Sequence, residues 1–98
     1  MKILITDDDN SFRSSVAKLL RLNGYEVAEA RDGKEFFEKF FYGKPDKLIM
    51  DIGLPGELSG LVCIEKIREK NKEIPIVVIT HYEDKILVPF ELNRLFLL

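Results

Sequence analysis

The stretch Lys47-Leu-Ile-Met-Asp51-Ile-Gly-Leu-Pro-Gly56 places a short apolar run directly before an acid and a series of turn residues. Short apolar runs bounded by turn residues are typical of strands buried inside a sheet. We therefore expect Asp51 at the carboxyl end of a central strand. In an open parallel sheet, ligands bind in the crevice at that end of the strands. The stretch thus predicts a functional carboxylate at Asp51.

The composition predicts a single small domain over residues 1–98. Its 15 Lys and Arg and 17 Asp and Glu are mixed along the chain and leave a formal net charge of −2. Because no basic stripe is present, direct nucleic-acid binding is not expected. The lone Cys63 cannot form a disulfide within the chain, which favours a reducing, cytoplasmic location and a packed apolar role on a helix. No apolar run approaches the length of a membrane span, so no membrane association is expected.

Apolar runs alternate with helical patterns along the chain. Strands are predicted over residues 2–6, 25–30, 48–51, 75–80 and 94–98. Helices are predicted between them, with N-caps at Asn10 or Ser11, at Asp32 and at Ser59. A weaker helical pattern lies between residues 82 and 92. Strands that alternate with helices form a parallel sheet covered on both faces, and right-handed crossovers favour a doubly wound α/β sheet with strand order 2-1-3-4-5.

In two of the predicted helices, the pattern predicts which side chains are buried and which face water. An aromatic stripe follows the second strand, and we expect it to pack in the core, since no basic groove accompanies it as a base-stacking surface would need. In the third helix, Leu61, Ile64 and Ile67 are expected to face inward, while Glu65, Lys66 and Arg68 face water. The aromatic stripe consists of Phe36, Phe37, Phe40 and Phe41.

Acids follow the two strands that the predicted order places side by side. Asp7, Asp8 and Asp9 come after the first strand and Asp51 ends the third. Like charges packed this closely repel, and a hard divalent cation such as Mg²⁺ among them would offset that repulsion. Mg²⁺ commonly binds one or two carboxylates beside phosphate oxygens. Asp51 is then the natural nucleophile for a phosphoryl group, and Thr80, at the neighbouring strand end, offers a hydroxyl donor.

Four segments in this order and spacing resemble the receiver domain of bacterial two-component response regulators, a flavodoxin-like fold. They are I-L-I-T-D-D-D-N (3–10), N-G-Y-E-V-A-E-A-R-D-G-K-E (23–35), L-I-M-D-I-G-L-P-G (48–56) and I-P-I-V-V-I-T (74–80). The resemblance covers nearly the whole chain. It implies that Asp51 accepts a phosphoryl group from the phosphohistidine of a sensor histidine kinase or phosphotransfer protein, which shifts a surface conformation.

The same resemblance assigns the other site residues. Asp8 would bind Mg²⁺ directly and Asp7 largely through water, while Gly53 would offer its backbone carbonyl to the metal. Thr80 would close over the phosphoryl group. Such a domain is a signalling acceptor rather than an enzyme, with at most Mg²⁺-dependent self-phosphorylation and self-dephosphorylation.

The chain departs from the family pattern after residue 80. Most members have a small residue after the Thr, whereas His81 and Tyr82 stand here. They would narrow access to Asp51, or His81 is a solvated loop histidine. The family's Lys-Pro pair and last helix are expected beyond Leu98, so the domain is expected to be incomplete at its C-terminus. Apolar sheet surface, including residues 95–97, would then be uncovered and would favour a covering partner or self-association.

Other functions fit the acids less well. A calcium loop starting at Asp7 would need Gly where Phe12 stands and Glu where Lys18 stands. A phosphohydrolase with an aspartyl nucleophile would need a cap domain or a later pair of acids. The serious alternative is a receiver-like protein-interaction module that is not phosphorylated.

Overall fold

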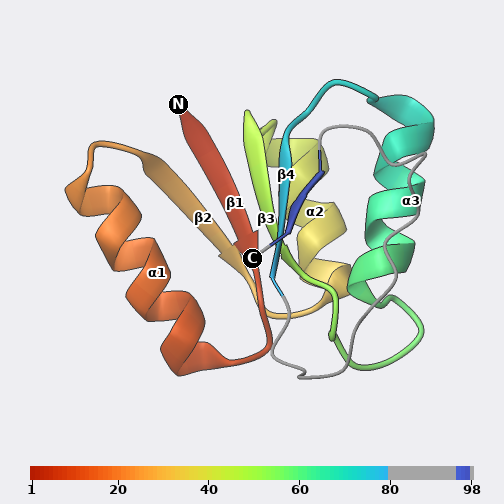
Figure 1. The fold of residues 1–98 in the computed structure, drawn as a ribbon, viewed down its shortest axis with the longest axis horizontal. Coiled ribbons are helices and arrows are strands. Elements are labelled where there is room, and N and C mark those ends of the chain that lie inside the picture. Colours follow the sequence, from red (N-terminus) through yellow and green to blue (C-terminus); the bar gives the residue numbers. More distant parts are fainter. Residues whose placement is uncertain (80–94, 98) are drawn as a thin grey trace.

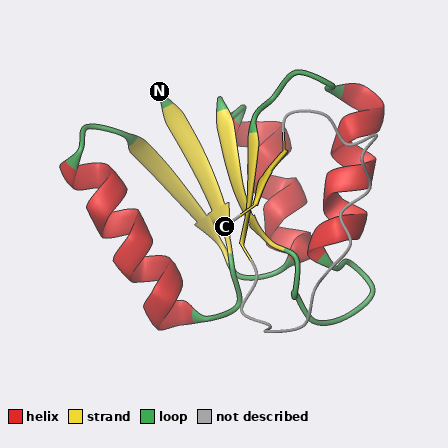
Figure 2. Ribbon diagram, in the orientation of Figure 1, coloured by secondary structure: helices red, strands yellow, loops and turns green. Residues whose placement is uncertain are grey.

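The computed structural model describes residues 1–79 and 95–97, which form a five-stranded sheet with helices packed on both of its faces (Figure 1). The strand order is β2-β1-β3-β4-β5, as predicted, and every neighbouring pair is parallel. Among the described residues, α1 covers one face, and α2 and α3 cover the other (Figure 2). The strands are β1 (Lys2–Thr6), β2 (Glu26–Ala30), β3 (Lys47–Asp51), β4 (Ile76–Ile79) and β5 (Leu95–Leu97), and the helices are α1 (Asn10–Leu22), α2 (Gly33–Gly43) and α3 (Gly60–Lys70).

The register brings the carboxyl ends of the central strands to one edge of the sheet. Thr6 of β1 lies opposite Ala30 of β2 on one side and Met50 of β3 on the other. Asp51, the last residue of β3, lies opposite Ile79 of β4. The residues that follow β1 and β3 therefore start from neighbouring positions.

The main core lies between the sheet and the helix pair α2 and α3. Strand side chains such as Leu4, Leu48 and Met50 pack there against Phe36 and Ile64, and all five are fully or almost fully buried. The alternate residues of β1, among them the buried Ile3 and Ile5, point to the face that α1 covers. Because both faces of the central strands are buried, their sequences are continuous apolar runs rather than alternating ones.

The start of α1 differs from the prediction of Asn10 or Ser11 as its cap. The N-cap is Asp9, whose Oδ1 accepts a hydrogen bond from the Phe12 N–H at 3.0 Å. An acid one residue earlier already satisfies that amide, so neither polar residue is needed as the cap. Asp9 is therefore more than a solvated acid at the helix start.

The caps of α2 and α3 are confirmed. Asp32 Oδ1 accepts a hydrogen bond from the Glu35 N–H at 2.9 Å, and Ser59 Oγ accepts one from the Val62 N–H at 3.3 Å. In α2 the Glu35 carboxylate reaches back to the Arg31 N–H at 2.9 Å, so both helix-start amides have acceptors. Of these two helices, α2 packs against β1 and β2 and also contacts α3.

Two burial predictions were wrong: Arg68 was expected to face water and Phe41 to pack in the core. Arg68 is buried, with 7% of its surface exposed, and its Nη1 donates to the Asn71 carbonyl at 3.2 Å at the end of α3. Phe36 is fully buried as expected, but Phe41 is 49% exposed. At about 100° per residue, the four phenylalanines spread over a wider arc than one core-facing stripe, so Phe37 still packs against the core whereas Phe41 is left on the surface.

Several predictions fall on residues 80–94 or 98, outside the described residues. These include the predicted fourth helix and the positions of Thr80, His81 and Tyr82. Within residues 1–79 and 95–97, no helix is long and apolar enough to cross a membrane. Cys63 is a buried residue of α3, as the sequence predicted.

Candidate functional site

Three carboxylates meet at the carboxyl edge of the sheet. Asp7, Asp8 and Asp51 each offer one carboxylate oxygen, and these three atoms all lie within 4.8 Å of one another. Asp7 and Asp51 are almost completely buried, whereas Asp8 is exposed. The predicted acidic cluster is therefore present, with Asp8 as its solvent-facing member.

Asp51 is held in place by backbone groups on both sides of it. Its Oδ1 accepts a hydrogen bond from the Gly53 N–H at 2.8 Å, and the next residue, Ile52, donates its N–H to the Ile79 carbonyl at 3.1 Å. Gly60, the first residue of α3, packs directly against this strand end: a Cβ there would overlap the Asp51 carbonyl oxygen. The position of Asp51 thus depends on a glycine that the sequence analysis did not single out.

Asp7 is fixed in a similar way at the end of β1. Its N–H donates to the Ala30 carbonyl at 3.0 Å, and its Oδ1 accepts from the Asp9 N–H at 2.9 Å. Arg13 Nη1 donates to the Asp7 carbonyl at 2.7 Å, while Arg13 Nε pairs with Glu29 at 3.2 Å. Arg13 therefore ties α1 to β1 and β2 beside the acids, a role that its position in the helical pattern did not reveal.

The donors fit a hard divalent cation. All three groups are carboxylates, which provide the oxygen ligands that Mg²⁺ and Ca²⁺ prefer over nitrogen or sulfur. One exposed and two buried acids leave one side of the cluster open to a further ligand. Gly53 adjoins the cluster through its N–H, while its predicted carbonyl contact to a metal remains a prediction.

The family model of the response regulator receiver domain matches residues 3–92. The chain belongs to this family. Within the described residues its acids stand at the strand ends that the sequence resemblance indicated. The family is that of response regulator receiver domains, and the architecture of the chain is flavodoxin-like.

Curated relatives include the response regulator MprA of two mycobacteria. The chain is 39% identical over 80 residues to MprA of Mycobacterium leprae (strain TN), a match that covers 82% of this chain and 35% of that protein. It is 38% identical over 80 residues to MprA of Mycobacterium avium (strain 104), with the same coverage. The chain thus spans about a third of the length of the curated relatives it matches.

Solved receiver domains superpose closely on the chain. The response regulator TrrA from Thermotoga maritima, in complex with Mg²⁺-BeF, matches with a TM-score of 0.77 and 39% identity, over 84% of this chain and 70% of that one. The chemotaxis response regulator CheY4 of Vibrio cholerae matches with a TM-score of 0.77 and 32% identity, over 85% and 70%. Both similarities extend over most of the chain.

Proposed function

We propose that Asp51 is a phosphoacceptor, which takes its phosphoryl group from the phosphohistidine of a sensor histidine kinase or of a phosphotransfer protein. A carboxylate oxygen of Asp51 attacks the phosphorus, the bond between phosphorus and the imidazole nitrogen breaks, and an acyl phosphate forms. The leaving imidazole takes up a proton. The observation that carries the proposal is the burial of Asp51 at the end of β3, within 4.8 Å of the Asp7 and Asp8 carboxylates.

The neighbouring acids would hold Mg²⁺, with Asp8 bound directly and Asp7 largely through water. When bound, the ion neutralises charge on the phosphoryl oxygens during transfer. The Gly53 N–H keeps one Asp51 oxygen fixed, so that the carboxylate is oriented before the phosphodonor arrives. The Mg²⁺-BeF complex of the similar protein TrrA supports a magnesium-dependent site.

Residues after β4 complete the proposal. The Thr80 hydroxyl would donate to a phosphoryl oxygen, and His81 and Tyr82 would narrow access to it. The negative charge of the phosphoryl group on Asp51 would shift the population of a surface conformation. The domain would then act as a cytoplasmic signalling switch rather than as a classical enzyme. Self-association through the C-terminal strand is a separate prediction, which a stable monomer in sedimentation would contradict.

Intact-mass measurement tests the acceptor directly. After incubation with Mg²⁺ and acetyl phosphate, the chain should gain the mass of one phosphoryl group, and chelation of Mg²⁺ should prevent the gain. Asp51→Ala should abolish the adduct. Asp46→Ala, which changes an exposed aspartate just before β3, should keep it. The absence of an adduct would favour the alternative, a receiver-like interaction module that is not phosphorylated.

A further inference from the structure

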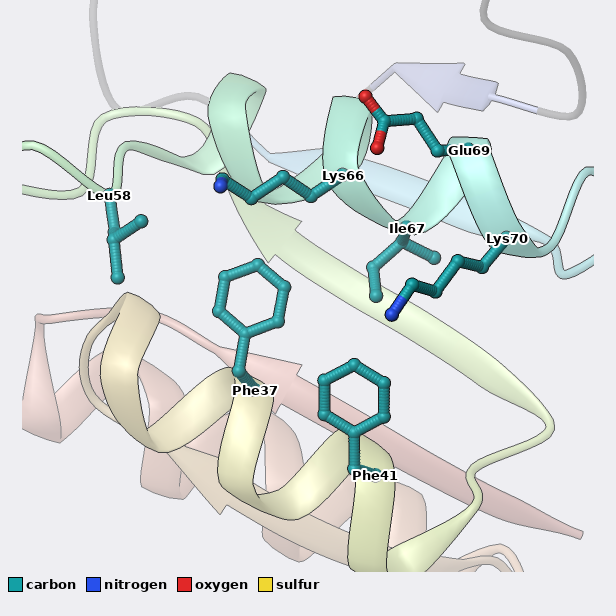
Figure 3. A pocket seen from close by; sticks show the side chains of 7 residues that line it. All are labelled: Phe37, Phe41, Leu58, Lys66, Ile67, Glu69 and Lys70. Carbon is teal, nitrogen blue, oxygen red and sulfur yellow. The ribbon is translucent and has the colours of Figure 1, made fainter.

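A groove lies between α2 and α3, away from the acids at the strand ends (Figure 3). Its volume is about 420 Å³, within the range of sites that bind ligands or side chains of a partner. Phe37 and Phe41 of α2 line one side, Ile67 of α3 lines the other, and Leu58 closes one end. The apolar part of the groove lining therefore consists of two aromatic and two aliphatic side chains.

The two aromatic rings face the groove, and Phe37 also packs against the core. The Phe37 and Phe41 ring centroids lie 6.3 Å apart with an interplanar angle of 21°. Phe41 is 49% exposed, and Phe37 is only partly buried. The half-exposed Phe41 ring and the partly buried Phe37 ring offer apolar area that a bound side chain would remove from water.

Two lysines border this aromatic surface. Lys66 and Lys70 stand one helical turn apart on α3, and Lys70 Nζ lies 5.1 Å from the centroid of the Phe41 ring, a cation–π contact. The Lys66 ammonium also lies on the groove side, whereas the Glu69 carboxylate turns away from the rings (Figure 3). In the part of the chain that the structure describes, neither lysine belongs to a salt bridge.

The groove therefore combines an apolar lining with two positive charges spaced by one helical turn. We propose that it binds an acidic amphipathic helix of a partner protein. Apolar side chains of that helix pack on Phe37 and Phe41, and carboxylates four residues apart pair with Lys66 and Lys70. When the partner helix lies along α3, the spacing of its two carboxylates matches the spacing of the two lysines, because four residues of a helix rise by about 6 Å in both partners. Helix-in-groove binding uses this spacing of anchors.

Charge favours a peptide over a nucleic acid. A nucleic-acid surface would need a wider basic patch, but Glu69 stands between the two lysines in sequence and the whole chain carries a net charge of −2. A small anion would need neither the second lysine nor the rings. The proposed site goes beyond phosphoryl transfer and does not use Asp51.

Fluorescence polarisation with the full chain tests the proposal. The probes are labelled helical peptides with a leucine stripe and two glutamates four residues apart. The peptides of the panel differ in the position of the glutamate pair relative to the leucine stripe. At least one should bind, and its affinity should fall as salt rises. The double variant Lys66→Glu/Lys70→Glu should bind it at least tenfold more weakly, whereas Lys18→Glu/Lys72→Glu, with the same net charge, should bind it like the wild type.

A charge swap provides the sharpest control. A peptide with lysines in place of its two glutamates should prefer the Lys66→Glu/Lys70→Glu protein over the wild type. Asp51→Ala should bind the acidic peptide unchanged, so the result does not depend on phosphorylation. Equal binding by the two double variants, or no binding by any peptide up to ~1 mM, would overturn the proposal. So would a dimer of the wild type that the Lys66→Glu/Lys70→Glu variant dissociates, since the groove would then be an interface between copies.

Discussion

The carboxyl edge of the sheet and the α2–α3 groove are built in opposite ways. At the edge, buried carboxylates of Asp7 and Asp51 accept hydrogen bonds from backbone amides, so their oxygens are fixed before any ligand arrives. In the groove, an exposed ring and two long lysine side chains provide the contacts. A fixed set of oxygens suits a small hard ion, whereas long side chains can adapt to a peptide. The two regions therefore suit different ligands.

The largest expected difference lies within one helix. Phe36 is fully buried while Phe41 is half exposed, although both belong to the aromatic stripe of α2. Phe36→Ala should lower the free energy of unfolding by about 3–5 kcal/mol, because it leaves a cavity in the core. Phe41→Ala should lower it by less than about 1 kcal/mol, as at other surface positions. Urea unfolding measures both, and equal losses would show that the groove side of α2 is part of the core.

Substitution of Gly60 tests how rigid the carboxyl edge of the sheet is. A Cβ at this position would overlap the Asp51 carbonyl oxygen and the Ile52 Cα, which are backbone atoms that cannot rotate away. Gly60→Ala should therefore cost about 3 kcal/mol and weaken Mg²⁺ binding. Gly24→Ala is the matched control, since its φ of +90° is strained for alanine but nothing lies within 4 Å. It should cost about 1–2 kcal/mol and leave Mg²⁺ binding intact in calorimetric titration.

Cys63 of α3 gives a smaller effect with a defined pH dependence. Burial raises the pKa of the Cys63 thiol from 9.0 to about 11, with a smaller opposing effect from Lys66. As the pH rises, the Cys63 thiol therefore stays protonated in the folded state after it has lost its proton in the unfolded state. The resulting stability is complete below pH 9 and is lost as the pH rises to about 11, an effect of the order of 2 kcal/mol.

Comparison with Cys63→Ala isolates that contribution. Thermal unfolding at several pH values should show a steeper alkaline loss in the wild type than in the variant. Identical slopes between pH 9 and pH 11 would contradict the assigned burial of the thiol. At pH 7 the native thiol should also resist alkylation.

The sequence predicted the carboxyl edge of the sheet better than it predicted the α2–α3 groove. Apolar runs that end on Asp7 and Asp51 specify both strands and the positions where they end, because a buried parallel strand needs an unbroken apolar sequence. The groove depends on side-chain direction within a helix. The pattern of phenylalanines did not reveal that Phe41 is exposed. The charge of Arg68 predicted exposure, whereas its side chain is buried.

Local contacts explain the remaining differences. The cap at Asp9 and the close approach of Gly60 to Asp51 depend on single hydrogen bonds and backbone distances, which periodicity does not encode. Arg13 became important only when the fold brought Glu29 and the Asp7 carbonyl beside it. The roles of Thr80, His81 and Tyr82 stay predictions, since these residues lie outside the described ones.

The central claim is that Asp51, and neither of its acidic neighbours, carries the phosphoryl group. After treatment with Mg²⁺ and acetyl phosphate, borohydride reduces an aspartyl phosphate to homoserine, which peptide mass mapping can locate. We predict homoserine at position 51 only, and none when Mg²⁺ is chelated. Homoserine at position 7 or 8, or none at position 51 in the presence of Mg²⁺, would contradict the account.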